Sequence, residues 1–187
     1  MTGMTGPADE DFRRSLVAAI PNLRAFAISL SRSSSAANDL VQETLLKALA
    51  NEAKFVPGTN TRAWLFTILR NTYFSDFRRA RREIADEDGA AAARLSTVPE
   101  QHGHMDMIDF KRALHQLSDD QREALLLVGA EGFSYEEAAV ICSCAVGTIK
   151  SRVNRARLRL AELLGIETVD DPRVPPATPA MANRPAG

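Results

Sequence analysis

The stretch of the chain with the clearest chemical use is basic and lies toward the C-terminal end. Residues 147–160 contain five lysines and arginines and no acidic residue. If this stretch is a helix turning by about 100° per residue, one face collects small and polar side chains that can reach base edges in a DNA major groove. Arginine suits guanine and asparagine suits adenine. The candidate base-reading residues are Gly147, Ser151, Asn154 and Arg155, with Thr148 and Lys150 at the margins of the face.

Three more arginines lie beside that face, where they can contact phosphates, which position a protein without reading sequence. They are Arg152, Arg157 and Arg159. The opposite side carries apolar residues spaced to pack on other helices, namely Ile149, Val153, Ala156, Leu160 and Leu163. An ordinary amphipathic helix with a basic surface is the alternative. The lack of any acid over residues 147–160 favours DNA binding.

A second basic stretch differs because it is rich in aromatic residues. Residues 64–77 hold five of the eleven aromatic residues, and residues 70–82 hold five arginines against one acid. Aromatic rings beside arginines suit single-stranded nucleic acid, since every base offers a face for stacking. Most of these rings are nevertheless expected to pack in the core.

The better candidates for contact with a melted strand are polar. The loop at residues 55–60 is short and polar enough to enclose an extruded base. Four residues recur at helical spacing in the stretch that follows and could form one strip facing DNA. They are Asn71, Ser75, Arg78 and Arg82.

Helices must position both stretches, because apolar residues recur at helical spacing through the chain. Residues 12–20 predict one helix, and Pro21 is expected to start a second, since proline suits a first helical turn. Serines at 33–35 can cap a third helix. A long helix is then expected from near Thr61 to about Arg82.

The second half of the chain carries two clear helix-start signals. Ser118 and Ser134 each precede a glutamine or glutamate by three residues, the spacing of a capping box. Helices are therefore expected to start near Asp119 and Tyr135. The second of these opens a helix-turn-helix whose turn lies at residues 143–145. No strand pattern stands out, so the expected fold class is all-α.

Composition divides the chain into two small helical domains, a connector and a tail. Residues 83–109 carry seven acids and one arginine, and residues 166–187 contain five prolines. The connector is either a bare tether or a segment that keeps the basic stretches off free DNA. The expected segments are a helical domain at 10–83, an acidic flexible linker at 84–105, a helix-turn-helix domain at 106–165 and a disordered tail at 166–187.

Other function classes find little support in the sequence. No apolar run approaches the ~20 residues of a membrane span, and the N-terminus lacks a secretion signal, so we expect a cytoplasmic protein without a membrane partner. Cys142 and Cys144 alone do not make a zinc site. The three histidines form no catalytic constellation. We therefore expect no cofactor, no metal and no enzymatic activity.

The order of these motifs resembles the sigma factors of the extracytoplasmic-function (ECF) group. Residues 37–44 are similar to the family's polymerase-binding helix, and residues 61–72 are similar to its promoter-melting helix. Residues 133–139 and 146–152 are similar to its region-four helix-turn-helix. The resemblance implies that the first domain is sigma region 2 and the second is sigma region 4. It also implies promoter DNA and core RNA polymerase, through the β′ clamp and the β flap, as partners.

The resemblance narrows to the general-stress-response subgroup called EcfG. Its basis is the loop at 57–60 followed by residues 63–71, together with residues 120–124 and 128–130. The subgroup implies control by a small NepR-type anti-sigma factor. It further implies release by a PhyR-type response regulator, whose sigma-like domain imitates such a protein and titrates the inhibitor.

The resemblance also implies roles for particular residues. Polymerase binding falls to Asp39, Leu40, Gln42 and Glu43. Reading of the minus-ten element falls to Phe55, Gly58, Thr59, Asn60, Asn71 and Arg78. Reading of the minus-thirty-five element falls to Thr148, Lys150, Ser151, Arg152, Asn154, Arg155 and Arg157.

Two other functions remain open at this point. A sigma-like decoy would only capture an anti-sigma factor, but its usual receiver domain needs ~100 or more residues that this chain lacks. A conventional helix-turn-helix regulator would bind duplex DNA tightly without polymerase. That function leaves residues 39–44 and the aromatic stretch unexplained.

Overall fold

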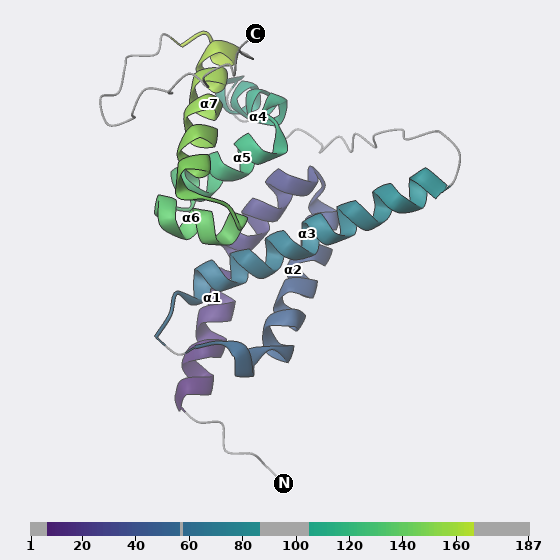
Figure 1. Ribbon diagram of the computed structural model, residues 1–187, viewed down its shortest axis with the longest axis vertical. Coiled ribbons are helices and arrows are strands. Elements are labelled where there is room, and N and C mark those ends of the chain that lie inside the picture. Colours follow the sequence, from purple (N-terminus) through teal and green to yellow (C-terminus); the bar gives the residue numbers. More distant parts are fainter. Residues whose placement is uncertain (1–6, 57, 87–104, 167–187) are drawn as a thin grey trace, which may run out of the picture.

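Figure 1 shows the computed structural model of the chain, which describes residues 7–56, 58–86 and 105–166. These residues form helices and no strand, so the predicted all-α class is confirmed. None of the helices in these ranges is long and apolar enough to cross a membrane. In chain order the elements are α1 (Pro7–Ser31), α2 (Ser34–Ala50), η1 (Glu52–Lys54), α3 (Thr61–Asp86), α4 (Met105–Gln116), α5 (Asp119–Leu125), η2 (Leu126–Ala130), α6 (Tyr135–Cys142) and α7 (Val146–Leu164).

Helices α1, α2 and α3 pack together as the first helical group. Ser33 caps α2 as predicted, because its side-chain oxygen accepts a hydrogen bond from the Ala36 amide. Helix α3 starts at Thr61, as expected, and continues past Arg82 to Asp86. The three helices bury one set of apolar side chains between them: Leu23, Phe26, Leu30, Val41, Ala48, Leu65, Phe66 and Leu69.

The prediction that Pro21 starts a new helix is wrong, because α1 continues through this residue. Proline inside a helix removes one hydrogen bond and crowds the preceding turn, at a cost of about 3 kcal/mol. Leu16, Leu23 and Phe26 are all buried on the same face of α1. Each such side chain gains about 1.5–3 kcal/mol on burial. Tertiary packing on both sides of Pro21 therefore outweighs its local preference.

Helices α4 to α7 form the second helical group, in which both predicted capping boxes are present. Ser118 and Gln121 bond reciprocally at the start of α5, and Ser134 and Glu137 do the same at the start of α6. The turn after α6 begins at Ser143, which adopts a left-handed conformation with φ 51°. The α6–turn–α7 segment is thus the predicted helix-turn-helix. Helix α7 buries Ile149, Val153 and Ala156, three of the five residues expected on its apolar side, while Leu160 and Leu163 are half-buried.

The two helical groups pack against each other, with α6 against α3 (Figure 1). At the centre of this contact the rings of Phe66 and Phe133 meet edge to face, with centroids 5.0 Å apart. One buried apolar cluster consequently contains residues of both groups, including Leu69 and Leu127. The acidic connector at 87–104 and the tail at 167–187 lie outside the described residues.

Candidate nucleic-acid interface

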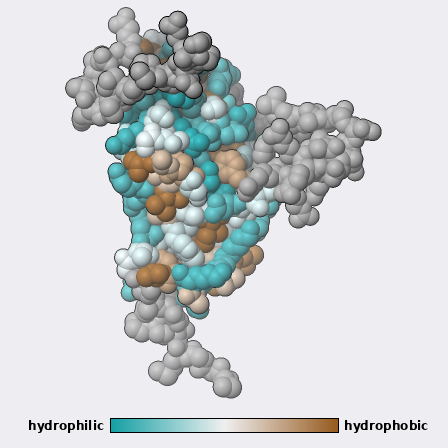
Figure 2. Space-filling model, viewed as in Figure 1, coloured by the Kyte–Doolittle hydropathy of each residue, from teal (hydrophilic) through white to brown (hydrophobic). Residues whose placement is uncertain are grey.

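Helix α7 presents the predicted DNA-reading face to solvent. Lys150, Arg155 and Arg157 are exposed, as is Gly147 at the start of the helix. Thr148, Ser151 and Asn154 are half-buried beside them. Because α7 is anchored by its buried opposite side, this face is available for a major groove. Figure 2 shows a largely hydrophilic surface, in which hydrophobic residues form small separate groups.

Like Arg159, which pairs with Glu162, the predicted phosphate contact Arg152 already has an acidic partner. Its guanidinium donates to the Asp120 carboxylate at 2.7 Å, and its side chain is only 22% exposed. A phosphate at this position would therefore compete with Asp120. Sequence reasoning missed this pair, since Asp120 lies 32 residues away and showed only as part of a helix start.

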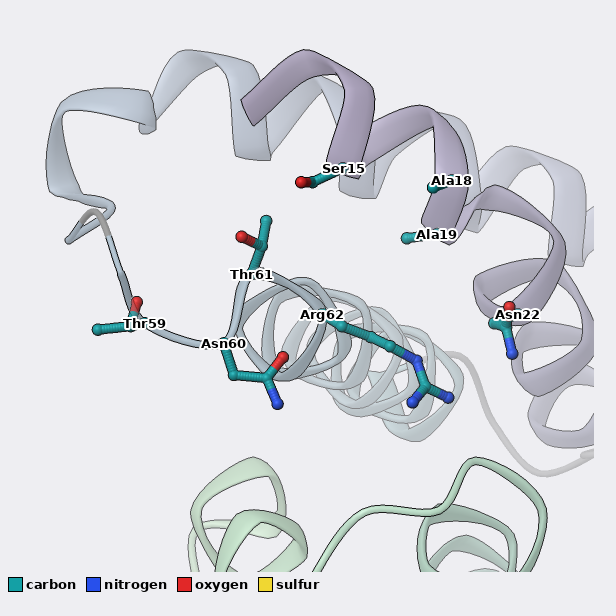
Figure 3. Close-up of a pocket in the computed structure, with 8 residues that line it drawn as sticks. All are labelled: Ser15, Ala18, Ala19, Asn22, Thr59, Asn60, Thr61 and Arg62. Atoms are coloured by element: carbon teal, nitrogen blue, oxygen red, sulfur yellow. The ribbon is translucent and has the colours of Figure 1, made fainter. Parts of the chain in front are cut away.

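Loop residues expected to enclose a base line a pocket of about 400 Å³ between α1 and the start of α3 (Figure 3). We call this the α1–α3 pocket. Its lining residues are Ser15, Ala18, Ala19, Asn22, Thr59, Asn60, Thr61 and Arg62. The predicted residues Thr59 and Asn60 are among them. Ser15, Asn22 and Arg62 were missed, because only the fold brings α1 beside the loop.

The geometry of the loop explains why Asn60 is held at the pocket edge. Gly58 has φ +87°, a conformation that side chains strongly disfavour, and the Thr59 amide donates to the Val56 carbonyl at 3.2 Å. The chain thus turns sharply before α3. Asn60 then caps α3, because its Oδ1 accepts a hydrogen bond from the Ala63 amide at 3.1 Å. The side-chain nitrogen of Asn60 takes no part in this cap and can donate to another residue.

Other residues expected to read the minus-ten element lie apart from this pocket. Asn71 is exposed on α3 and lies about 16 Å along the helix from Asn60. Phe55 is half-buried between Phe12 and Trp64, with ring centroids 5.3 Å and 5.4 Å away. The side chain of Arg78 lies outside the part of the chain that the structure describes. The pocket and the Asn71 surface are therefore two distinct features of α3.

The polymerase-binding residues expected on α2 are divided between surface and core. Asp39 and Gln42 are exposed, and Glu43 pairs with Lys47 at 2.7 Å. Leu40 is only 7% exposed, so its contribution is to the packing of α2. The same helix exposes the apolar Leu46 and Leu49, which sequence reasoning had not placed on this surface.

Polar bonds between the helical groups involve the edge of the α1–α3 pocket. Asn60 Nδ2 donates to Glu137 Oε1 at 2.6 Å, and Asn22 Nδ2 donates to Glu131 Oε2 at 2.9 Å. The Arg62 guanidinium also pairs with Glu131. The pKa of Glu137 is lowered by the backbone hydrogen bond from Ser134 and then by the bond from Asn60. This carboxylate therefore stays ionised at neutral pH.

A buried ion pair joins α3 to α5 further along the contact. Arg70 Nε donates to Glu123 Oε1 at 2.7 Å, and the Glu123 side chain is fully buried. Burial raises the pKa of Glu123, while the charge of Arg70 opposes that shift. Burial also raises the pKa of the neighbouring Cys142 thiol, which keeps the thiol protonated. The Arg70–Glu123 pair is thus a charged contact beside the apolar cluster that the two groups share.

Both halves of the chain match family models. The model described as Sigma-70 region 2 matches residues 16–83, and the model described as Sigma-70, region 4 matches residues 107–160. The chain is 58% identical over 165 residues to the ECF RNA polymerase sigma factor EcfG of Rhodopseudomonas palustris (strain TIE-1). That alignment covers 88% of this chain and 91% of the relative.

Solved structures give the same assignment. The chain is similar to the sigma factor RpoE in complex with the anti-sigma factor NepR from Bartonella quintana, with a TM-score of 0.76 and 55% identity over 85% of this chain and 99% of that one. It is also similar to CnrH in complex with the cytosolic domain of CnrY, with a TM-score of 0.61 and 25% identity over 87% and 92% of the two chains. The chain belongs to the extracytoplasmic-function group of RNA polymerase sigma factors.

Proposed function

We propose that this sigma factor serves the general stress response as an EcfG-type protein, held inactive by a NepR-type anti-sigma factor and released by a PhyR-type response regulator. The observation that carries this proposal is the 58% identity to EcfG, which extends over 88% of the chain. The similarity to a sigma factor solved with NepR supports the same partner class. The protein would act in the cytoplasm as a binding factor, without making or breaking bonds.

Three surfaces divide the work in this proposal. Asp39 and Gln42 on α2, with Glu43 beside them, bind the polymerase β′ clamp, and the second helical group binds the β flap. The α1–α3 pocket and Asn71 read the melted minus-ten element. The exposed face of α7 reads the minus-thirty-five element, with Arg155 at base edges and Arg157 at phosphates.

The two-domain design gives such a factor its selectivity through bivalency. Each domain alone makes few contacts with DNA and binds it weakly. Core polymerase fixes the spacing between them, so that the second recognition step becomes intramolecular. Opening the duplex and extruding a base cost a few kcal/mol, which stacking and pocket contacts offset.

Run-off transcription tests this function. The purified chain and sigma-free core polymerase are supplied with a promoter library, and the Asn71→Ala and Arg155→Ala variants are compared with Val17→Ala, which alters an exposed residue of α1 that does not line the α1–α3 pocket. We expect discrete start sites that require the chain, weaken in both reading variants and persist in the control. Addition of a NepR-type protein should abolish them, and a phosphorylated PhyR-type protein should restore them.

The contrary outcomes are equally specific. Tight duplex binding without polymerase recruitment would indicate a conventional regulator. Capture of the anti-sigma factor without transcription would indicate a decoy. Initiation that a NepR-type protein leaves unaffected would retain the sigma factor but remove the proposed regulation.

A further inference from the structure

Arg152 on α7 is bonded to two other parts of the second helical group. Its Nη2 donates to Asp120 Oδ2 of α5 at 2.7 Å, and its Nη1 donates to Cys144 Sγ, in the turn before α7, at 3.9 Å. The side chain is only 22% exposed, whereas Arg155 and Arg157 of the same helix are exposed. The Arg152 guanidinium is therefore already engaged by partners within the protein before any DNA binds.

The start of α5 is a firm anchor for the bond from Arg152. The capping box of Ser118 and Gln121 fixes this helix start, and Asp120 lies in its first turn. Arg122 and Glu123 in the next positions of α5 are buried. Helices α5 and α7 also pack against each other (Figure 1). A bond to Asp120 thus ties α7 to a helix that is itself held in place.

Arg152 lies on α7 between the buried side of the helix and its DNA-reading face. On a helix surface, residues three and four positions apart are neighbours. The neighbours of Arg152 on the reading face are therefore Thr148, four residues before it, and Arg155, three residues after it. The bond to Asp120 consequently restrains the rotation of α7 about its own axis on the flank that carries Arg155.

Such a restraint matters because base recognition depends on exact placement. A rotation of about 10° moves an atom that lies ~6 Å from the helix axis by about 1 Å. Groups that recognise a ligand must be held within about 0.5 Å of their working positions. The buried Ile149 and Val153 hold α7 by apolar contacts, which have no preferred direction. A charge-assisted hydrogen bond at the edge of the helix adds the directional restraint that these contacts lack.

Building on the proposed function, we propose that Asp120 and Arg152 are a positioning pair for recognition of the minus-thirty-five element. The pair stays intact when duplex DNA binds, and it holds Arg155 at the angle at which that side chain meets base edges. Arg152 acts through Arg155 and contacts no phosphate, which differs from the role that the sequence predicts for it. Asp120, an acid close to a DNA-binding surface, then supports specific binding.

The direct test measures the preference of the full chain for one duplex sequence. The unaltered chain selects a duplex from a randomised pool at low salt, and its affinities for this duplex and for a scrambled version are measured by fluorescence anisotropy. Removal of an acid near bound DNA ordinarily raises affinity for every sequence. Asp120→Asn should instead lower the ratio of the two affinities by about three- to tenfold, up to the loss expected for one base contact, without weakening binding to the scrambled duplex.

Arg152→Lys separates positioning from phosphate contact. Lysine keeps the charge and binds phosphate as a point charge, but it lacks the planar fork that reaches Asp120 and Cys144 together. A phosphate contact would tolerate this change, whereas the positioning pair predicts the same fall in the ratio as Asp120→Asn. The variant with both changes should lose little more than either single variant, because each breaks the same bond. Asp120→Glu keeps a carboxylate for Arg152 and should retain most of the preference.

Glu136→Gln is the matched control for charge. It removes one acid from an exposed position on α6, in the same helical group as Asp120. The ratio of the two affinities should not change in this variant. A variant that folds poorly would bind both duplexes more weakly, so a fall in the ratio alone identifies a positioning effect.

Three outcomes would overturn the proposal. Tighter binding of Asp120→Asn to both duplexes at an unchanged ratio would show that Arg152 is a phosphate contact restrained by Asp120. An equal fall in the ratio for Glu136→Gln would show a general effect of charge, and a chain that selects no duplex sequence would have no reading to position. Neither polymerase nor an anti-sigma factor is present, so failure of the sigma function in run-off transcription would leave this test unaffected.

Discussion

The α7 face and the α1–α3 pocket both carry hydrogen-bond donors suited to nucleic acid, but the partners of these donors in the fold differ. Arg155 and Arg157 on α7 face solvent. Asn60 and Arg62 at the pocket are bonded to acids of the other helical group. Two of the α7 arginines predicted to contact DNA also have acidic partners, but these belong to their own group: Arg152 pairs with Asp120, and Arg159 pairs with Glu162. The two DNA-reading surfaces therefore differ in whether their acidic partners come from the same helical group or from the other one.

This difference separates two kinds of regulation. An ion pair within one helical group stays in place when the two groups separate, so its effect on the DNA-reading surface is permanent. An acid from the other group acts only while the groups are together.

The largest expected effect tests whether the two groups fold as one unit. Ile149→Ala removes a fully buried side chain from α7 and should lower the free energy of unfolding by about 2–5 kcal/mol. Trp64, the only tryptophan, lies in the first group and reports on it by fluorescence. Since one apolar cluster spans both groups, we expect the Trp64 signal and circular dichroism to shift together in urea.

Leu65→Ala in the first group is the counterpart, because that side chain is also fully buried. It should shift both signals by a comparable amount. If Ile149→Ala leaves the Trp64 transition in place while circular dichroism changes, the groups fold independently. The contact between them would then contribute little to stability.

A smaller effect is expected on duplex binding by α7. Arg155→Ala should cost about 1–3 kcal/mol on the preferred sequence and relax the preference at particular bases. Arg157→Ala should weaken all sequences similarly and reduce the salt slope by about 1. Binding is measured on matched and scrambled duplexes at several salt concentrations. Arg159→Ala, whose side chain pairs with Glu162 at 3.0 Å, serves as a neighbouring comparison.

Equal, sequence-independent losses for Arg155→Ala and Arg157→Ala would contradict the division between base and phosphate contacts. The exposed α7 face would then be a general DNA-binding surface. The comparison with the α1–α3 pocket would then be between two surfaces that bind DNA without reading its sequence.

The smallest expected effect concerns pH and His115, on α4 beside Arg32 of the connection between α1 and α2. Burial lowers the pKa of His115 below 6.5, and the charges of Arg32, Arg122 and Lys111 act in the same direction. The unfolded chain therefore takes up a proton before the folded chain as pH falls. The contribution of His115 to stability is present above pH 6.5 and is lost as pH decreases from there to the lowered pKa.

Urea unfolding between neutral and mildly acidic pH checks this expectation. The His115→Gln variant should lose less stability over that range than the unaltered chain. Because the His115 carbonyl accepts from Arg32 Nη2 at 3.0 Å, acidification should also weaken the contact of α4 with the connection between α1 and α2. Parallel pH profiles for the two proteins would remove His115 from this role.

The local parts of the fold could be predicted from the sequence. Both capping boxes, the Ser33 cap and the buried side of α7 depend on residues three or four positions apart, so their spacing identifies them. Pro21 failed as a boundary for the opposite reason. Its local preference was overridden by residues that pack on α1 from elsewhere in the chain.

The candidate site divides in the same way. The α7 face could be outlined because its members share one helix. Only part of the α1–α3 pocket could be predicted. Thr59 and Asn60 were expected in it, whereas Asn22 and Arg62 come beside them only when the chain folds. The acids bonded to its lining residues could not be found, because Glu131 lies 69 residues from Arg62 and Glu137 lies 77 residues from Asn60. Pairing over such distances depends on how the two groups dock.

The bond between Asn60 and Glu137 joins two side chains that are already immobilised. Asn60 Oδ1 is fixed by capping α3, and Glu137 Oε2 is fixed by the Ser134 amide at the start of α6. The rotamer freedom of both residues is therefore lost when their own helices form, before the groups meet. Docking adds this hydrogen bond at little further cost in side-chain entropy. Neither helix end therefore has to rearrange when the two groups meet.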